Sequence, residues 1–454
     1  MSKVPIGPTY DEMYQPNQLD PKFKARAQAA LKDELDPYNL FNITWRNQSG
    51  AIHKIVLPKA LTGVDANIVV MLGKHFPSGS HKVGPAYATL MEGIIDGDIV
   101  PGYHNILGPS TGNFGIGVAY IANLMRLKST IIMPDNMSKE RYDRIKGYGG
   151  NLDLTPGTES DVILTLEKTH KLSKDEKNVA LAQFELMPNY RFHRHITGQS
   201  AVEACTDIGD GKIKAFVSAP GSAGTLAAGD HIKTVYPEAT ITALEPYECS
   251  TLMNGGRGQH RIEGIGDKMC TLIHNVLNTD YIALIRDEDT IRGLKVLRDG
   301  KAIFKTFGLE TKQMLAMRDY FGVSGVCNIL GAIKMAKHLK LSKDDNVVTL
   351  ATDGFDRYDS VLKQLESKHP NIDETLLKTW FKEVFLNVKD DHIKKTTSER
   401  EKQRLFKQKE DDWLKFGYDK AYLDAMKTKD FWEKEYQKVH EYNAKIEQKR
   451  GKAL

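Results

Sequence analysis

The sequence predicts an α/β protein whose sheets are mostly parallel and covered by helices on both faces. Two observations lead to this fold class. From residue 52 onward, short strand-like runs alternate with longer helical stretches, which is the pattern of parallel sheets with helical crossovers. The strand-like runs are rich in β-branched and aliphatic residues, as expected of strands that are buried on both faces.

The alternating region contains eight predicted strands and seven predicted helices. The strands are expected at residues 55–57, 67–72, 105–107, 129–133, 180–184, 215–218, 240–244 and 346–351. The helices are expected at residues 86–95, 115–127, 140–147, 160–171, 199–206, 225–235 and 327–339. Ligands of such sheets bind at the carboxyl ends of strands, in the turns that lead into helices. A functional site is therefore expected in these turns.

Three regions of the chain differ in composition. Residues 1–50 are rich in Pro, Asn, Tyr and charge, and we expect an N-terminal arm with one helix at 21–35, lying on the body or on a partner subunit. Residues 51–362 form the alternating core. From 363 to 454, strand patterns fade and charged residues dominate, with aromatic residues recurring at helical intervals. We expect a helical C-terminal extension that packs on the core or on another subunit, rather than a regulatory module.

Length and charge exclude several classes of protein. With 454 residues the chain can bury more than one core. The net charge of +4 gives no indication of a nucleic-acid or anionic-membrane partner, and no apolar run reaches membrane-spanning length. The four cysteines have no metal-ligand spacing, so we expect no metal site and reduced cysteines. The polar N-terminus has no apolar signal-peptide region, and we expect a cytoplasmic protein.

One lysine follows a tight turn and precedes an apolar helix. The turn is at 77–79, and Lys82 stands before the predicted helix 86–95. The run 68–72 has the composition of a buried strand leading into the turn. Desolvation and a helix N-terminus both lower the pKa of an ammonium group. A lysine of lowered pKa suits imine chemistry with an aldehyde, although an ordinary solvated lysine is the alternative.

The turn after the predicted strand 105–107 combines glycine with small hydroxyl residues at the start of a helix. It contains Ser110, Thr111, Gly112 and Asn113. Such a turn exposes backbone N–H groups that suit a carboxylate, and the asparagine adds an amide donor. A simple helix cap with glycines for tight packing explains this turn equally well. We call residues 110–115 the carboxylate turn.

The turn after the predicted strand 215–218 suits a phosphate. It contains Gly221, Ser222, Ala223, Gly224 and Thr225. The glycines allow close approach of the backbone, so an anion can be held at the helix start without a cationic side chain. Since the turn is neither GxGxxG nor a Walker loop, it favours a phosphate-bearing cofactor over a dinucleotide or ATP. We call residues 221–225 the phosphate turn.

These three features point to one set of ligands. A lysine for an imine and a turn for a phosphate match pyridoxal phosphate, which carries an aldehyde and a phosphate. The carboxylate turn matches the amino-acid substrate of such a cofactor.

The chain resembles the fold-type II pyridoxal-phosphate enzymes of the cysteine synthase and cystathionine β-synthase group. The resemblance runs from about residue 55 to 358 and is carried by the order and spacing of the segments 77–82, 110–115, 133–141, 148–150, 183–198, 221–225, 245–246, 263–266 and 322–325. It implies two open, mostly parallel sheets flanked by helices, with the cofactor between them. It also implies that a smaller subdomain at about 85–195 is inserted in the catalytic core, that pyridoxal 5'-phosphate is the cofactor, and that the protein is a homodimer.

The resemblance implies a role for each motif. Lys82 is expected to bind the cofactor and to act as the catalytic residue, Asn113 to contact the cofactor ring, and the phosphate turn to bind its phosphate. Residues 110–112 and Gln183 are expected to bind the substrate. We expect His193 and His195 to be structural and His81 to point away from the cofactor.

Two departures from the family pattern stand out. Valine and glycine follow Lys82 where the family usually has Asp-Arg. The segment 352–358 resembles a motif in which a serine meets the pyridine nitrogen, but Gly354 occupies the place of that serine. Thr352 or Asp353 is expected to contact the pyridine nitrogen in place of that serine. An aspartate there would hold the ring nitrogen protonated, whereas a hydroxyl would not.

The activity implied by the resemblance is β-elimination or β-replacement on a serine- or cysteine-type amino acid, through an aminoacrylate intermediate. In this expectation Lys82 removes the α-proton, a group leaves the β-carbon, and a nucleophile such as a thiol adds. One alternative is elimination alone, by an ammonia-lyase, dehydratase or desulfhydrase acting on another amino acid. The other is a catalytically silent relative that acts as a binding partner through its C-terminal helices.

Overall fold

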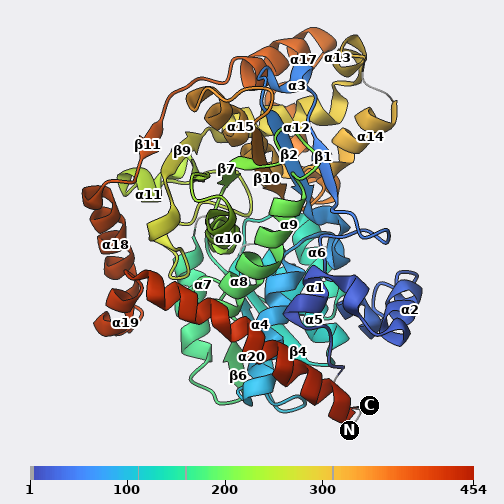
Figure 1. The fold of residues 1–454 in the computed structure, drawn as a ribbon, viewed down its shortest axis with the longest axis vertical. Coiled ribbons are helices and arrows are strands. Elements are labelled where there is room, and N and C mark those ends of the chain that lie inside the picture. Colours follow the sequence, from blue (N-terminus) through green and yellow to red (C-terminus); the bar gives the residue numbers. More distant parts are fainter. Residues whose placement is uncertain (1–4, 111, 159–160, 309–310, 454) are drawn as a thin grey trace.

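The computed structural model describes residues 5–110, 112–158, 161–308 and 311–453, and these form two sheets with helices around them (Figure 1). The larger sheet has the strand order β1-β2-β10-β7-β8-β9-β11. Its strands are β1 (Lys54–Val56), β2 (Asn67–Leu72), β7 (Ile213–Ser218), β8 (Thr240–Pro246), β9 (Tyr281–Ile285), β10 (Asn346–Ala351) and β11 (Ile393–Lys395). The neighbouring strands are parallel except at the two edges, where β1 and β11 pair antiparallel.

The smaller sheet has four strands, all parallel, in the order β5-β4-β3-β6. They are β3 (Asn105–Pro109), β4 (Lys128–Pro134), β5 (Asn151–Thr155) and β6 (Asn178–Ala180). Two open, mostly parallel sheets flanked by helices, with a helical C-terminal extension, confirm the predicted fold class.

Twenty α-helices surround the sheets in the described residues. They are α1 (Tyr10–Tyr14), α2 (Pro21–Ala30), α3 (Lys59–Thr62), α4 (Val83–Asp96), α5 (Asn113–Leu124), α6 (Lys139–Gly147), α7 (Val162–Leu172), α8 (Met187–Phe192), α9 (Gly198–Glu203), α10 (Ala227–Val235), α11 (Thr251–Asn254), α12 (Asp287–Asp299), α13 (Lys301–Thr306), α14 (Thr311–Tyr320), α15 (Val323–His338), α16 (Asp359–Lys368), α17 (Glu374–Phe381), α18 (Glu399–Trp413), α19 (Lys420–Ala425) and α20 (Lys429–Ala453). A π-helical turn at His193–Thr197 joins α8 to α9. Of these helices, none is both long and apolar enough to cross a membrane.

The central strands are apolar because both faces of the larger sheet are covered. Along β2, Val69 and Met71 belong to one buried apolar cluster, while Ile68 and Val70 belong to another. Successive side chains of a strand point to opposite faces, so the sheet separates two cores. All six residues of β10, an interior strand between β2 and β7, are buried.

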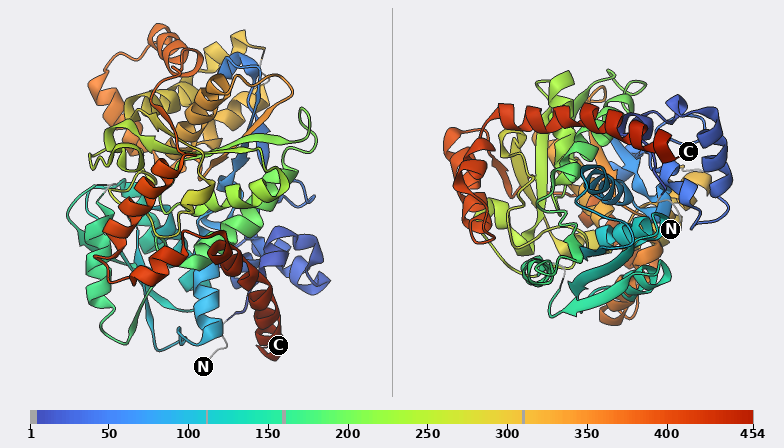
Figure 2. Two further views of the ribbon diagram at one scale, coloured as in Figure 1. Left: turned by 60° about the vertical axis from the view of Figure 1, so that its left-hand side comes forward. Right: turned by 90° about the horizontal axis from the view of Figure 1, so that it is seen from below.

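The N-terminal arm and the C-terminal extension lie against each other on the body of the same chain. Helix α20 runs across α4 and α8 and contacts α1 (Figures 1 and 2). Arg450 donates to both carboxylate oxygens of Glu12, at 2.7 and 2.7 Å. The backbone N–H of Tyr10 donates to Asn443 at 2.8 Å. The arm therefore packs on the extension of its own chain, and it also contacts the body directly, since the Tyr87 hydroxyl donates to the Pro8 carbonyl at 2.8 Å.

Some boundaries differ from the prediction. Helix α2 ends at Ala30 rather than at residue 35, because the Asn39 amide donates to the carbonyls of Ala30, Asp33 and Glu34 and replaces helical hydrogen bonds there. Strand β6 is Asn178–Ala180 rather than 180–184, so Gln183 lies in a loop. Helix α7 begins at Val162, and the predicted start at Ser160 lies outside the described residues.

Three strands were missing from the prediction. β5 is a polar edge strand, β9 was overlooked although it is apolar, and β11 has three residues. The C-terminal extension was expected to lack strands, and this is wrong, because β11 pairs with β9 and extends the larger sheet.

Candidate active site

One cavity lies where strand ends of both sheets meet. It offers about 340 Å³ free of protein atoms, part of it open to solvent. Its lining includes Lys82, Ser110, Gly112, Asn113, Gln183, Gly221, Ser222, Asp267 and Thr352. The fold thus brings together the lysine, the carboxylate turn and the phosphate turn, which are separate in the sequence.

Lys82 stands at the N-cap of α4 with its amine in the cavity. The Nζ donates to Gln183 Oε1 at 3.2 Å and to Ser222 Oγ at 3.4 Å. The departure from the family pattern after this lysine has a steric reason. A Cβ on Gly84 would lie 2.0 Å from the Phe192 ring, so the phenyl group occupies the space that a side chain would need.

The carboxylate turn is shaped by Ser110 and by an arginine behind it. The Ser110 Oγ accepts the backbone N–H groups of Gly112 and Gly115, at 3.0 and 2.9 Å. A Cβ on Gly112 would lie 2.6 Å from the Arg141 guanidinium, so any other residue there would have to displace that buried group. Thr111, which was also expected to bind the substrate, lies outside the described residues.

The phosphate turn has backbone donors available for an anion. Within the described chain, the backbone N–H groups of Ser222 and Ala223 make no hydrogen bond. Ala223 has φ +64°, a left-handed conformation that lets successive N–H groups converge on an anion. The Ser222 Oγ accepts from the Asn189 amide at 2.9 Å, which fixes the turn.

The glycines of the phosphate turn leave no room for larger residues. A Cβ on Gly224 would lie 2.2 Å from Asn189 Oδ1, and one on Gly221 would lie 2.7 Å from the carbonyl oxygen of Gly264. The Thr225 hydroxyl is 2.8 Å from the Ser218 hydroxyl and so is engaged within the turn. The phosphate turn thus has a fixed shape, and its two backbone N–H groups without a partner in the described chain, those of Ser222 and Ala223, fit a phosphate group.

Asp353 lies one layer behind the cavity, next to Asn113. Its Oδ2 accepts from the Asn113 amide and from the Tyr358 hydroxyl, both at 2.7 Å, and Arg357 donates to the Asn113 carbonyl oxygen. Burial raises the pKa of the Asp353 carboxyl, and the Arg357 guanidinium opposes this shift. Thr352, not Asp353, contributes to the described lining of the cavity.

Two residues near the cavity were not singled out from the sequence: Arg141 is only part of the segment 133–141, and Asp267 lies outside every motif. Arg141 is fully buried, pairs with Glu263 at 2.9 Å and donates to the Tyr358 hydroxyl at 3.3 Å. Asp267 lines the cavity, and burial raises the pKa of its carboxyl to about 7, against the opposing effect of Lys82. The only sequence signal for Asp267 is an acid directly after Gly264-Ile265-Gly266.

The histidines near the site lie outside the described lining of the cavity. His81 packs against Trp45 and His193, with ring centroids 5.6 and 5.1 Å away. His193 Nδ1 is 2.9 Å from the Thr197 hydroxyl, and His195 bonds to Asp11 at 2.7 Å. His195 thereby ties the arm to the body.

The chain is similar to known pyridoxal-phosphate enzymes over its core. The family model described as "Pyridoxal-phosphate dependent enzyme" matches residues 55–353. A cysteine synthase of Staphylococcus aureus is 33% identical over 296 residues, which are 64% of this chain and 87% of that protein. Cysteine synthase 3 of Caenorhabditis elegans is 27% identical over 306 residues, which are 67% of this chain and 84% of that protein.

Solved structures show the same likeness. O-acetyl serine sulfhydrylase isoform 3 of Entamoeba histolytica has a TM-score of 0.60 and 25% identity, covering 73% of this chain and 93% of that one. A hydrogen sulfide-producing enzyme of Fusobacterium nucleatum has a TM-score of 0.58 and 25% identity, covering 67% of this chain and 95% of that one. The chain therefore belongs to the pyridoxal-phosphate dependent enzyme family, in the group that includes the cysteine synthases, and it uses pyridoxal 5'-phosphate as its cofactor.

Proposed function

We propose that this enzyme catalyses β-elimination or β-replacement on a serine- or cysteine-type amino acid. One observation carries the proposal: the amine of Lys82 shares a single cavity with the carboxylate turn and the phosphate turn. The cysteine synthases among its relatives support the same reaction class.

The residues of the cavity fit the cofactor. Lys82 is the amine that would bond to its aldehyde carbon, and the phosphate turn, 221–225, offers unused backbone N–H groups for its phosphate. Asn113 and Thr352 line the wall where the ring would lie, with Asp353 behind Asn113. When bound, pyridoxal phosphate withdraws electron density from the substrate α-carbon, which makes the α-proton removable.

The chain's own residues would then position the substrate and move its protons. Residues 110–112 would bind the substrate carboxylate at the start of α5, because a helix N-terminus favours an anion. Gln183 and Ser222 hold the Lys82 amine, at 3.2 and 3.4 Å. Lys82, once free, would take the α-proton as general base and later return it.

Absorption spectroscopy tests the proposal. The protein loaded with pyridoxal phosphate is expected to show a visible band that changes when serine, O-acetylserine or cysteine is added. Formation of a thioether in the presence of a thiol would indicate replacement, and pyruvate alone would indicate elimination. A band that no β-substituted amino acid changes would contradict the proposal and favour another substrate class. A protein that binds no cofactor would support the silent relative.

We further propose that the protein is a homodimer in the cytoplasm. Each chain would consist of the arm 1–50, the core 51–362 with its smaller subdomain at about 85–195, and the extension 363–454. The resemblance to cysteine synthases supports the dimer. The four cysteines are free and buried, which supports a reducing compartment. Sedimentation equilibrium tests the dimer: a mass of twice the chain is expected, and a single-chain mass at micromolar concentration would contradict it.

A further inference from the structure

Asp267 is held in the cavity by a rigid turn. Gly264 and Gly266 have φ of +98° and +77°, which only glycine adopts without strain. The N–H of Gly266 donates to the Pro220 carbonyl at 3.1 Å, and the Thr251 hydroxyl donates to the Asp267 carbonyl at 3.0 Å. The turn is thereby fastened to the strand end that precedes the phosphate turn, so the position of Asp267 relative to that turn is fixed.

The carboxyl group of Asp267 is buried but not satisfied. The residue is 7% exposed, and its Oδ2 has no hydrogen-bond partner among the residues that the structure describes. It lines the same cavity as Lys82, Gln183 and Ser222. An unpaired buried carboxyl oxygen costs free energy, so a partner from outside the protein is expected at this place.

Two other buried acids show how the chain satisfies carboxyl groups that have no ligand. Glu245 accepts the N–H groups of Leu252 and Met253, at 2.6 and 3.0 Å. Asp230 accepts from Tyr190, Asn275 and Asn278, at 2.7, 2.7 and 2.9 Å. Asp267 has no such set of donors within the described chain, so a purely structural role leaves its Oδ2 unexplained.

We propose that Asp267 is a catalytic acid that protonates the group leaving the substrate β-carbon, and that the enzyme therefore accepts unactivated serine or cysteine. This inference rests on the proposed function. Hydroxide and thiolate are poor leaving groups and depart more readily with a proton, whereas acetate or chloride departs as an anion. Burial raises the pKa of Asp267 to about 7, so the carboxyl holds a transferable proton near neutral pH.

The step balances without any further reactant. The α-proton passes to Lys82, and the electron pair of its bond forms the double bond between the α- and β-carbons. The bond from the β-carbon to oxygen or sulfur breaks, and its electron pair stays on the oxygen or sulfur. That atom takes the proton of Asp267 and leaves as water or hydrogen sulfide. In replacement, the sulfur of the incoming thiol bonds to the β-carbon and the Asp267 carboxylate takes the thiol proton. The electron pair of the double bond takes the proton that Lys82 returns to the α-carbon.

Three substrates that differ in their leaving group test the inference on the cofactor-loaded enzyme. For Asp267→Asn, the kcat/KM for pyruvate formation is expected to fall by about 10²-fold or more with serine, less with cysteine, and little with β-chloro-L-alanine. The order follows the basicity of the leaving group. Asp267→Ala, which removes the carboxyl altogether, is expected to give the same order. A loss of equal size with all three substrates would overturn the role of Asp267.

The same substrates separate this inference from the proposed function. If the wild-type enzyme turns over β-chloro-L-alanine but Asp267→Asn shows no dependence on the leaving group, only the role of Asp267 fails. If the wild type turns over none of the three, the proposed function fails. Glu245→Gln is the matched control, because Glu245 lines the neighbouring cavity with Asp267. Its ratio of kcat/KM between serine and β-chloro-L-alanine is expected to equal that of the wild type.

A stability measurement gives a readout that does not depend on turnover. A carboxyl whose folded-state pKa is raised stabilises the fold at low pH and loses this contribution as the pH rises through that pKa. The urea midpoint of the wild type is therefore expected to fall relative to Asp267→Asn as the pH rises from about 4 to about 7. Lys82, Glu245 and His274, which face Asp267 from the two cavities, are present in both proteins. If the difference in urea midpoint between the wild type and Asp267→Asn does not change with pH, the pKa of Asp267 is not raised in the folded protein, and its role as an acid near neutral pH is contradicted.

Discussion

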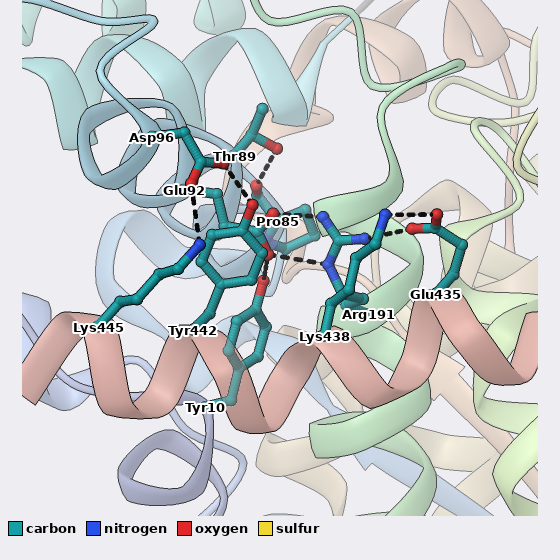
Figure 3. A network of polar contacts seen from close by, with 10 residues as sticks. All are labelled: Tyr10, Pro85, Thr89, Glu92, Asp96, Arg191, Glu435, Lys438, Tyr442 and Lys445. Carbon is teal, nitrogen blue, oxygen red and sulfur yellow. Dashed lines mark hydrogen bonds and ion pairs between the residues drawn. The ribbon is translucent and has the colours of Figure 1, made fainter.

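Two buried charged regions lie on α4, and they differ in how completely their polar atoms are paired. At the N-terminus of α4, the cavity around Lys82 contains Oδ2 of Asp267 without a partner in the described chain, and Asp353 behind it has an unpaired Oδ1. Further along α4, Glu92 belongs to a network that α20 covers (Figure 3). Buried polar groups are normally satisfied, so unpaired carboxyl oxygens in or behind a cavity are consistent with a ligand site, whereas a network of paired charges is consistent with a structural role.

The covered network, which we call the α20 clamp, consists of Tyr10, Glu92, Arg191 and Glu435. Tyr10 and Arg191 both donate to the Glu92 carboxylate, and Arg191 also donates to Glu435 at 2.6 Å (Figure 3). The four residues come from the arm, α4, α8 and α20. Each of them is at most 9% exposed. The clamp thus holds the two ends of the chain on the helix that begins next to Lys82.

The largest effect is expected from Lys82→Ala, which is expected to abolish the visible cofactor band and to lower kcat by about 10⁴-fold, because it removes both the covalent attachment and the general base. Absorption spectra and pyruvate formation measure both.

Lys409→Met is the control, since Lys409 is also buried and burial lowers its pKa to about 7. Its Nζ donates to the Leu272 carbonyl at 2.9 Å, so stability is expected to fall while the band remains. A band that survives Lys82→Ala would contradict the assignment.

The next largest effect is expected in the clamp. Arg191→Met leaves Glu92 and Glu435 buried without their guanidinium partner, which is expected to lower the free energy of unfolding by about 3–5 kcal/mol. Urea denaturation measures it. The double variant Glu92→Gln/Arg191→Met is expected to lose less than the sum of the two single variants. If the two losses of unfolding free energy simply add, the Glu92 and Arg191 side chains do not interact. If folded Arg191→Met no longer shows the cofactor band, the clamp also supports the cavity around Lys82, which would contradict a purely structural role.

Gly224→Ala is expected to weaken cofactor binding with a smaller effect. The new methyl group would lie 2.2 Å from Asn189 Oδ1, so the phosphate turn must shift. Overpacking costs about 1–3 kcal/mol, which corresponds to an affinity about 5- to 150-fold lower. Titration of the visible band with pyridoxal phosphate measures this. Gly147→Ala, where a Cβ meets nothing within 4 Å, is expected to leave the affinity unchanged.

The smallest effect is expected at the exposed margin of the clamp. Lys445 contacts Asp96 at 3.4 Å, and the two side chains are 49% and 36% exposed. Lys445→Met is expected to change the free energy of unfolding by less than about 1 kcal/mol, because exposed ion pairs are weak and screened by salt. Urea denaturation at low and high salt checks this. A loss as large as that of Arg191→Met would show that burial does not decide the strength of these pairs.

Much of the cavity could be predicted from local sequence. Lys82, the carboxylate turn and the phosphate turn each follow a strand and begin a helix, and in a parallel sheet such positions converge at one edge. Eight of the predicted residues line the cavity: Lys82, Ser110, Gly112, Asn113, Gln183, Gly221, Ser222 and Thr352, the last as one of two candidates for the place of the serine. Their roles in binding and catalysis remain predictions.

Residues whose importance depends on distant segments could not be predicted. Asp267 directly follows the segment 263–266, which carries part of the family resemblance, but nothing in the local sequence relates this acid to Lys82. Only the fold brings the two residues to one cavity. In the sequence, Glu92 and Arg191 are single charged residues of two separate helices, and nothing indicates that they pair. They are buried because α20 covers them, and the α20 partner of Arg191, Glu435, lies 244 residues further along the chain. Strand β11, with three residues, is too short to show a pattern and forms because β9 offers a free edge.

The most direct test of the account is to locate the attached cofactor. Treating the loaded enzyme with sodium borohydride makes the bond between lysine and cofactor permanent, and peptide mass mapping then identifies the modified residue. The account predicts the added mass of the pyridoxyl phosphate group on the peptide that contains Lys82 and on no other. Modification of a different lysine, such as Lys409, or none at all would contradict the placement of the active site in this cavity.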